Sequence, residues 1–231
     1  MNLSELKLQT LGLDRSLFGK IYTFVDFGNV NRWFGDDIWG WNDYKLLEGE
    51  KLIIDIGKMA DFINLFSEGK FFYYGFDKGN DASLHMTVVA RKNGFKAVTK
   101  PIQWIKHYLS SDEKSIYKSP LLKDKIKTDK KGSFITIPKC NFDVEMCLDI
   151  VRLQDKYDTV CVFTSDNDFT PLIEYLIKRG KKVILIYSNP VRETLLAKVT
   201  LKINAQDIKS NICGIKKSSE SFSTYKKRTS P

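Results

Sequence analysis

The strongest constraint on the fold of this chain is the stretch from Asp158 to Gly180, which reads DTVCVFTSDNDFTPLIEYLIKRG. It begins with a short apolar run typical of a buried strand and continues into a polar turn with two carboxylates, Asp166 and Asp168. Pro171 then opens a run with helical spacing of apolar residues, which ends at Gly180. A strand, an acidic turn and a helix in this order predict an open α/β sheet whose site lies outside the carboxyl ends of the strands.

Further apolar runs along the chain alternate with helical patterns. Strands are predicted at residues 21–25, 70–75, 96–99, 134–137, 181–187 and 201–203, and helices at 53–66, 84–92, 142–154 and 191–197. Residues 31–50 hold Trp33, Trp39 and Trp41 without periodicity, and they predict a long loop or irregular insertion. Indoles that cover the core are favoured over indoles that stack on bases beside a site. Because strands and helices alternate, we expect an α/β fold with a mainly parallel central sheet and helices on its faces.

Composition predicts one domain with basic additions. Residues 20–205 carry the alternating strands and helices, and their number suits a single α/β domain. Residues 1–19 predict a short helix or a loose leader in front of it. A Lys- and Ser-rich segment at 106–133 predicts an exposed, mobile insertion, and the basic residues 206–231 predict a flexible tail.

The net charge of +9 is concentrated in two parts of the chain. Residues 100–140 hold ten lysines against four acidic residues, and residues 202–231 hold six lysines and one arginine against two acidic residues. Segregated positive charge favours an anionic partner, with nucleic acid ahead of a membrane surface.

Several other classes of protein do not fit the sequence. No apolar run approaches the ~18 residues of a membrane span. The amphipathic start of the chain carries Glu5 and Lys7, unlike a secretory signal, so we expect a soluble, cytoplasmic protein. The four cysteines form no CxxC pair and the two histidines are scattered, which predicts reduced thiols rather than a zinc site.

Carboxylates stand at the ends of predicted elements in three places. Asp26 ends the first strand, Asp143 opens a helix, and Asp166 and Asp168 follow a later strand. Bringing these groups together costs Coulomb repulsion unless a cation lies between them. Mg²⁺ and Mn²⁺ take such oxygen ligands, and the arrangement suits metal-assisted hydrolysis of a phosphodiester. Asp149 is a further candidate, although it lies about 120° around the helix from Asp143.

Each carboxylate also has an ordinary structural explanation. Asp26 could bind the amides of its own turn, and Asp143 could be stabilised by the dipole of the helix that it opens. Asp166 or Asp168 could cap the helix that follows. The metal site is favoured by the combination, because two separate buried strands end in carboxylates beside polar turn residues.

Three motifs resemble those of the NYN domain family, within the PIN-like nuclease superfamily. They read FVDFGNVN at 24–31, KCNFDVEMCLDIV at 139–151 and VFTSDNDFTPLIEYLIKRGKKV at 162–183, in the order that the family has. The resemblance covers roughly residues 20–205 and implies a Rossmann-like, PIN-type three-layer α/β/α sandwich. It also implies a nuclease that depends on Mg²⁺ or Mn²⁺ and most often acts on RNA.

The resemblance assigns roles to individual residues. The family's metal-site aspartates fall on Asp26, Asp143, Asp166 and Asp168, with Asp149 at a secondary acidic position, and the substrate contacts fall on Asn29, Lys139, Thr164, Ser165 and Asn167. The sequence departs from the family where Lys-Gly-x-Asp is usual. Lys139 here stands four residues before Asp143, with no glycine between them.

Other enzymes with related acidic motifs fit less well. A haloacid-dehalogenase-type phosphatase needs a second aspartate two residues after the first, where this chain has Gly28. A Toprim-type site needs a glutamate after an earlier strand, where this chain has Asp26. The alternative from another class is a non-catalytic nucleic-acid-binding or scaffolding protein with the same fold, since phosphate contacts alone give affinity. RNA is expected ahead of DNA as the partner, and a homodimer is compatible with the sequence.

Overall fold

The structure, a computed structural model, describes residues 3–110, 126–188 and 190–217. Its centre is a six-stranded sheet in the order β10-β9-β8-β1-β3-β4, in which every neighbouring pair of strands is parallel. The strands are β1 (Ile21–Asp26), β3 (Gly69–Phe76), β4 (Lys96–Pro101), β8 (Thr159–Phe163), β9 (Lys182–Tyr187) and β10 (Leu201–Asn204). The parallel central sheet that the sequence predicts is confirmed.

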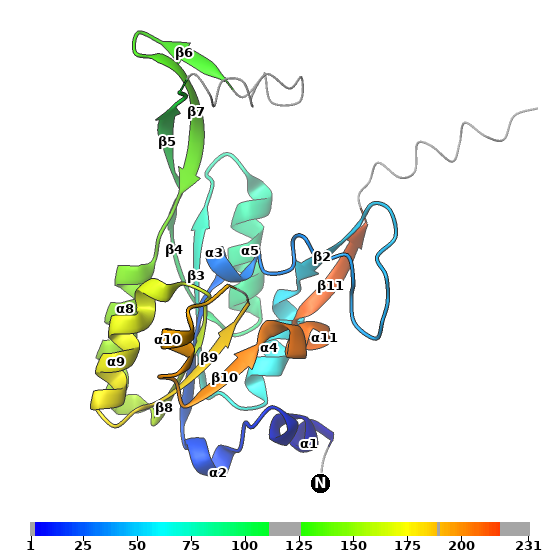
Figure 1. The fold of residues 1–231 in the computed structure, drawn as a ribbon, viewed down its shortest axis with the longest axis vertical. Coiled ribbons are helices and arrows are strands. Elements are labelled where there is room, and N and C mark those ends of the chain that lie inside the picture. The colour runs from blue at the N-terminus through cyan, green and yellow to red at the C-terminus, as the bar shows by residue number, and fades with distance from the viewer. Residues whose placement is uncertain (1–2, 111–125, 189, 218–231) are drawn as a thin grey trace, which may run out of the picture.

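Helices cover both faces of this sheet (Figure 1). One face carries α4 (Ile56–Asn64), α5 (Asp81–Lys92) and α11 (Lys209–Ile212), and the other carries α8 (Asp143–Arg152), α9 (Thr170–Lys178) and α10 (Glu193–Leu196). The shorter helical segments are α2 (Arg15–Phe18), α3 (Phe27–Val30), η1 (Gln154–Lys156), η2 (Asn167–Phe169) and η3 (Ala205–Ile208). The chain therefore has the three-layer α/β/α architecture of a PIN-like fold.

The alternation of side chains along β8 divides the core into two layers. Cys161 and Phe163 pack in the cluster on the α4 side, whereas Val160 and Val162 pack in the cluster on the α8 side. Successive side chains of a strand point to opposite faces, and helices cover both faces here. That is why β8 reads as an unbroken apolar run rather than an alternating one.

The turn after β8 is set by a few residues with clear local roles. Pro171 lies in the first turn of α9, where its missing N–H removes no intrahelical bond. Ile173 and Leu176 then face the core. Gly180 has a φ of +74°, a conformation that glycine adopts at little cost, and the chain reverses there into β9.

Two smaller antiparallel sheets accompany the central one. β2 (Glu50–Ile54) pairs with β11 (Cys213–Lys217). β5 (Gln103–Tyr108), β6 (Lys127–Asp129) and β7 (Gly132–Lys139) form a three-stranded sheet in the order β5-β7-β6. Figure 1 shows this second sheet projecting beyond the central sheet, at the end where the parallel strands finish. We call it the arm.

For two predicted segments, a helix and the C-terminal tail, the predicted starting residue is wrong. The helix expected over 53–66 begins only at Ile56, because Leu52 and Ile54 are buried in strand β2. The flexible tail expected from 206 is ordered as far as Lys217, because η3, α11 and β11 occupy this part of the chain and β11 pairs with β2. Residues 218–231 lie outside the described residues.

At the start of the chain, the sequence predicts a short helix or a loose leader, and the structure has helices. Residues 3–19 contain α1 (Leu3–Thr10) and α2, and Leu8, Leu13 and Phe18 are buried in the core. The insertion differs from expectation. The insertion expected to be mobile contributes strands to the arm on both sides, at 103–108 and 127–139. Its central part, 111–125, lies outside the described residues.

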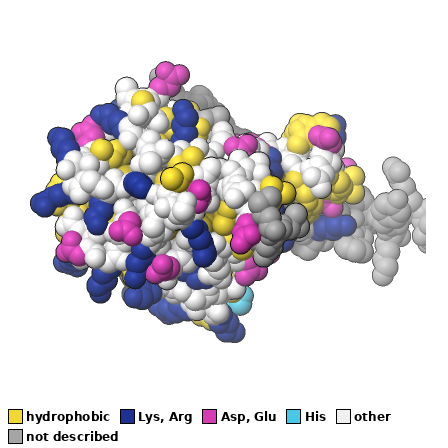
Figure 2. All heavy atoms as spheres, turned by 90° about the horizontal axis from the view of Figure 1, so that it is seen from below, with side chains coloured by type: hydrophobic (Ala, Val, Ile, Leu, Met, Phe, Trp, Pro, Cys, Tyr) yellow, Lys and Arg dark blue, Asp and Glu magenta, His cyan; other side chains and the backbone are white. Residues whose placement is uncertain are grey.

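The surface at the opposite end from the arm carries charges of both signs. Figure 2 shows lysine and arginine side chains interspersed with acidic ones on this face, where the parallel strands begin. Lys20, for example, is paired with Glu68 at 3.3 Å. None of the helices within the described residues has the length and apolar character of a membrane-spanning segment.

Candidate metal centre at the carboxyl edge of the sheet

The order of the strands fixes where a site can form. From β1 the chain runs to β3 and β4 on one side and later returns to β8 on the other side, so the order reverses between β1 and β8. In open α/β sheets, the crevice outside the carboxyl ends of the strands at such a reversal is where ligands bind. Asp26 ends β1, and the turn with Asp166 and Asp168 follows β8.

Three carboxylates meet at this edge. Asp143, Asp166 and Asp168 each offer an oxygen, and these oxygens lie within 4.8 Å of one another. Asp143 is the first residue of α8, and Asp166 caps η2 by accepting a hydrogen bond from the Asp168 N–H at 2.9 Å. Asp166 is therefore both a cap and a member of the cluster, whereas α8 and α9 begin without a side-chain cap.

Asp26 borders the same space from the end of β1. It lines a cavity of about 460 Å³ together with Asp143 and Asp166. Its carboxylate accepts hydrogen bonds from the Asn29 N–H and the Thr164 hydroxyl, both at 3.4 Å. The pKa of Asp26 is raised to about 6, chiefly by burial. The negative charges of Asp143 and Asp166 contribute to the rise, and the two hydrogen bonds oppose it.

Asp143 is held in place by a neighbouring amide. The Asn141 side chain donates to Asp143 Oδ2 and accepts from the Asp143 N–H, both at 2.7 Å. Burial raises the pKa of the Asp143 carboxyl, the hydrogen bond from Asn141 lowers it, and the charges of Asp166 and Asp168 raise it. The carboxylates of the cluster therefore repel one another when they are ionised.

The chemistry of this group fits a hard divalent cation. Among the described residues, none of the four carboxylates takes part in a salt bridge, so no lysine or arginine neutralises them directly. Every donor is a carboxylate oxygen, the ligand type that Mg²⁺ and Mn²⁺ prefer. A cation between these oxygens would attract each carboxylate and so offset the repulsion among them.

Asn29 connects the two halves of the centre. Its side-chain oxygen accepts hydrogen bonds from the Ser165 N–H at 3.0 Å and from the Trp33 indole N–H at 2.8 Å. Because Asn29 follows β1 and Ser165 follows β8, these bonds tie the two strand ends together. This geometry gives Asn29 a positioning role beside the substrate contact that the sequence predicts.

The polar residues of the turn after β8 also bind neighbouring backbone. Thr164 is fully buried, and its hydroxyl accepts from the Asp166 N–H at 3.1 Å while donating to Asp26. The Ser165 hydroxyl accepts from the Ser188 N–H at 3.0 Å. The Asn167 side chain accepts from the Arg192 N–H at 2.9 Å. These bonds stabilise the turn itself and give no evidence on the substrate. The substrate contacts predicted for Thr164, Ser165 and Asn167 therefore stay predictions.

Asp149 and Lys139 occupy different surroundings. Asp149 lies outside the cluster of three, and its Oδ2 accepts a hydrogen bond from the Tyr73 hydroxyl at 2.9 Å. Burial, with the bond to Asp149 adding to it, raises the pKa of Tyr73. Lys139 ends β7, is exposed and lines the cavity of Asp26.

The structure adds basic residues that the sequence did not single out. Arg32 is exposed and lines the cavity, beyond the end of α3. Lys100, near the end of β4, lies close enough to Asp143 to lower the pKa of that carboxyl slightly, and its ammonium binds Glu145 at 2.6 Å. Arg32 is six residues from Asp26, a proximity that could have drawn attention to it, whereas only the fold brings Lys100 near Asp143.

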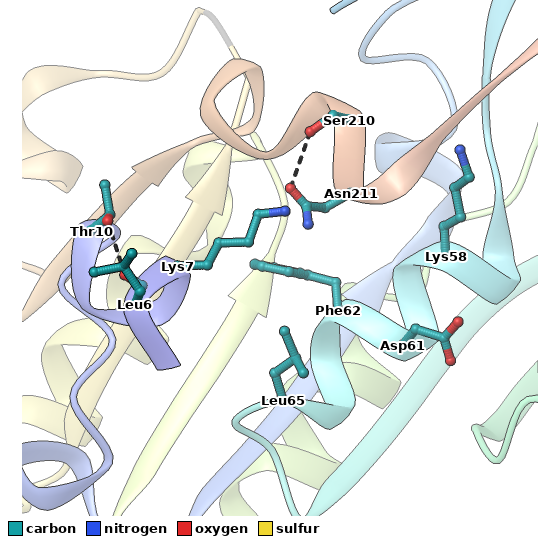
Figure 3. Close-up of a pocket in the computed structure, with 9 residues that line it drawn as sticks. All are labelled: Leu6, Lys7, Thr10, Lys58, Asp61, Phe62, Leu65, Ser210 and Asn211. Atoms are coloured by element: carbon teal, nitrogen blue, oxygen red, sulfur yellow. Dashed lines mark hydrogen bonds between the residues drawn. The ribbon is translucent and has the colours of Figure 1, made fainter. Parts of the chain in front are cut away.

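A second cavity, of about 570 Å³, is lined by none of these four carboxylates (Figure 3). It is formed by α1, α4 and α11, and the figure shows Lys7 and Phe62 reaching toward each other across the gap between α1 and α4. Its one carboxylate is Asp61. Although it is larger, it lacks a cluster of groups that could perform chemistry.

Comparison with known proteins supports the fold independently. A crystal structure of a protein of unknown function from Vibrio parahaemolyticus RIMD 2210633 is similar, with a TM-score of 0.52 and 17% sequence identity. The match covers 85% of this chain and 97% of that one. No curated protein matches the sequence. The sequence model of the NYN domain matches residues 20–204, which is most of the chain, and the protein therefore belongs to the NYN domain family.

Proposed function

We propose that this protein is a metal-dependent nuclease that hydrolyses phosphodiester bonds in RNA, with Mg²⁺ or Mn²⁺ bound by Asp26, Asp143, Asp166 and Asp168. The observation that carries the proposal is the meeting of carboxylates from three separate segments at the reversal point of the sheet. Membership of the NYN family supports a nuclease-type hydrolase and a nucleic acid substrate.

The residues of the chain have distinct parts in this proposal. A divalent ion in the centre would activate a water and stabilise the leaving oxygen. Asn29 and Asn141 fix the positions of the carboxylates through the bonds described above. Arg32 and Lys139 line the same cavity and would hold the substrate phosphates, so that the scissile bond lies over the acidic group.

A non-catalytic nucleic-acid-binding protein is the competing function. The lysines near the cavity and in the arm would serve it equally well. The partly buried carboxylate of Asp26 favours the enzyme. Burial and like charges raise its pKa, which means that keeping it ionised costs stability, and a protein that only binds nucleic acid gains nothing in return for that cost.

Cleavage assays separate the two functions. Labelled single- and double-stranded RNA and DNA are incubated with the protein in Mg²⁺, Mn²⁺ or EDTA, beside the variants Asp26→Asn and Asp168→Asn. We expect RNA cleavage that needs the metal and is lost in both variants. Asp61→Asn, an exposed carboxylate on α4, is the matched control and should cleave like the wild type.

A second measurement does not depend on turnover. Mg²⁺ or Mn²⁺ should raise the thermal unfolding midpoint of the wild type and of Asp61→Asn, but much less that of Asp168→Asn, since a ligand stabilises only the state that binds it. Binding of RNA without cleavage in any metal would refute the enzyme and support the binding protein. Undiminished cleavage by both aspartate variants would indicate a contaminating nuclease.

A further inference from the structure

The arm is continuous with the acidic cavity. Ile102, just before β5, and Pro138, near the end of β7, both line that cavity. Trp104 is two residues beyond Ile102 and lies directly opposite Pro138 in the antiparallel register of β5 and β7. The indole therefore stands beside residues that form the cavity wall.

The two faces of the arm differ in composition. Asp129 accepts hydrogen bonds from the Lys106 ammonium at 2.6 Å and from the Tyr108 hydroxyl at 3.0 Å, which places these side chains on one face. Alternation along β5 puts Trp104 on this same face. Ile105 points to the opposite face, where Ile137 is its cross-strand partner. We call the first surface the Trp104 face.

On the Trp104 face, some side chains pack against one another, whereas Trp104 itself is exposed. The Lys106 ammonium lies 4.3 Å from the centre of the Phe134 ring, and Tyr108 packs against the same ring with centroids 5.7 Å apart. Trp104 is 52% exposed and, within the described residues, pairs with no other ring. An indole that is half exposed and attached to a paired strand offers a rigid flat surface at little entropic cost.

The charge of the arm matches a polyanion. The described segments 103–110 and 126–139 hold five lysines against one aspartate. Lys127 lies on the Trp104 face, because it pairs with Phe134 in the register of β6 and β7. Lys106 lies there too, but its ammonium is paired with Asp129, so Lys127 is the lysine of this face that no carboxylate binds among the described residues. Lysines beside an exposed aromatic ring are the combination with which proteins bind nucleic acid single strands.

We propose that the Trp104 face binds single-stranded nucleic acid, with a base stacked on the Trp104 indole and the backbone continuing into the acidic cavity. The proposal deepens the nuclease function above and rests on it, because that function is the reason for the nucleic-acid backbone to continue from the Trp104 face into the acidic cavity. A base inside a duplex is stacked on its neighbours and has no free face for the indole, so the arm selects single strands.

The test measures binding in EDTA, where no cleavage interferes. Fluorescence anisotropy gives the affinity of the full chain for a labelled oligouridylate and for a duplex of the same length. The variants are Trp104→Ala, Trp104→Phe and Ile105→Ala, the last being a matched control because Ile105 is 44% exposed on the other face of the same strand. Circular dichroism checks that each variant keeps the fold.

Stacking of one base is lost in Trp104→Ala, so its affinity for the single strand should fall by roughly 5- to 150-fold. The affinity for the duplex should stay close to that of the wild type. Trp104→Phe should retain much of the single-strand affinity, and Ile105→Ala should bind like the wild type. Equal single-strand affinity of Trp104→Ala and the wild type would overturn the proposal while leaving the nuclease function untouched.

Two further outcomes separate the proposals from each other. A loss of single-strand binding in Trp104→Ala, in a protein that cleaves nothing with any metal, would support the arm's role and refute the nuclease function. Light scattering after size exclusion reports the oligomeric state. A wild-type dimer that becomes a monomer in Trp104→Ala would show that the face joins two copies of the chain, and would overturn the proposal.

Discussion

Replacing Asp26 by asparagine should stabilise the metal-free protein. Burial and the charges of Asp143 and Asp166 raise the pKa of Asp26 from 3.8 to about 6. A shift of about two units corresponds to about 3 kcal/mol of cost for keeping this carboxylate ionised in the folded state. Asparagine fills nearly the same space and carries no charge. Its side-chain oxygen can still accept the hydrogen bond that the Asn29 N–H donates to Oδ1, whereas its amide nitrogen takes the place of Oδ2, which accepts the long bond from the Thr164 hydroxyl.

The stability that Asp26→Asn gains over the wild type should be present at high pH and disappear as the pH falls. Above about pH 6, the folded carboxylate is ionised and the full cost is present. As the pH falls from about 6 to 3.8, the folded protein takes up a proton that the unfolded chain does not yet bind, so the cost disappears. Asp26→Asn should therefore exceed the wild type in stability by about 3 kcal/mol near pH 8, and by close to nothing near pH 4.

Urea unfolding followed by circular dichroism in EDTA measures this difference. Asp61→Asn serves as the control, because its exposed carboxylate should give a much smaller difference at either pH. Adding Mg²⁺ should then reverse the order, since the wild type gains stability from the bound ion and Asp26→Asn gains less. An Asp26→Asn variant that is less stable than the wild type near pH 8 in EDTA would refute this reasoning.

Three further substitutions test other parts of the site. Asn29→Ala removes the acceptor of the Ser165 N–H, and we expect a loss of roughly 1–3 kcal/mol in urea unfolding; an unchanged midpoint would mean that the bond does not join the two strand ends. Gly75→Ala places a Cβ 2.5 Å from Cys140 Sγ, so unfolding should show a cost of about 1–3 kcal/mol, whereas wild-type stability would mean that Cys140 moves aside. Arg32→Ala should reduce the slope of log affinity for RNA against log salt concentration by about one, and an unchanged slope would exclude a phosphate contact.

The strands of the central sheet could be predicted from the sequence because each is a short apolar run that differs clearly from the residues around it. The run Val160–Phe163 and the run in β9 are apolar on both faces, and each is bounded by turn residues, so their type and place follow from composition alone. The positions of Asp26 and Asp166 beside each other were also expected, since both follow strands whose carboxyl ends share one edge.

The elements that were missed depend on contacts between distant segments. Leu52 to Ile54 runs directly into a helical pattern, and only its pairing with Cys213–Lys217 makes it a strand. Ile215 stands among lysines and looks like part of a solvated tail until that partner is known. The bond from Ser165 to Asn29 likewise exists only because β1 and β8 are neighbours. Periodicity within a short window contains no information on such pairs.

The arm leaves the domain and returns to it at one place, since Gln103 and Lys139 are directly opposite each other in the register of β5 and β7. Opposite residues of antiparallel strands lie only about 5 Å apart, a gap that a two-residue hairpin turn can span. A change in the length of the arm beyond Trp104 and Pro138 therefore need not move β4 or α8, whereas Pro138 itself lines the acidic cavity. On the binding role proposed for the arm, changes in this outer part would alter the preference for single strands, while the carboxylate centre stays as it is.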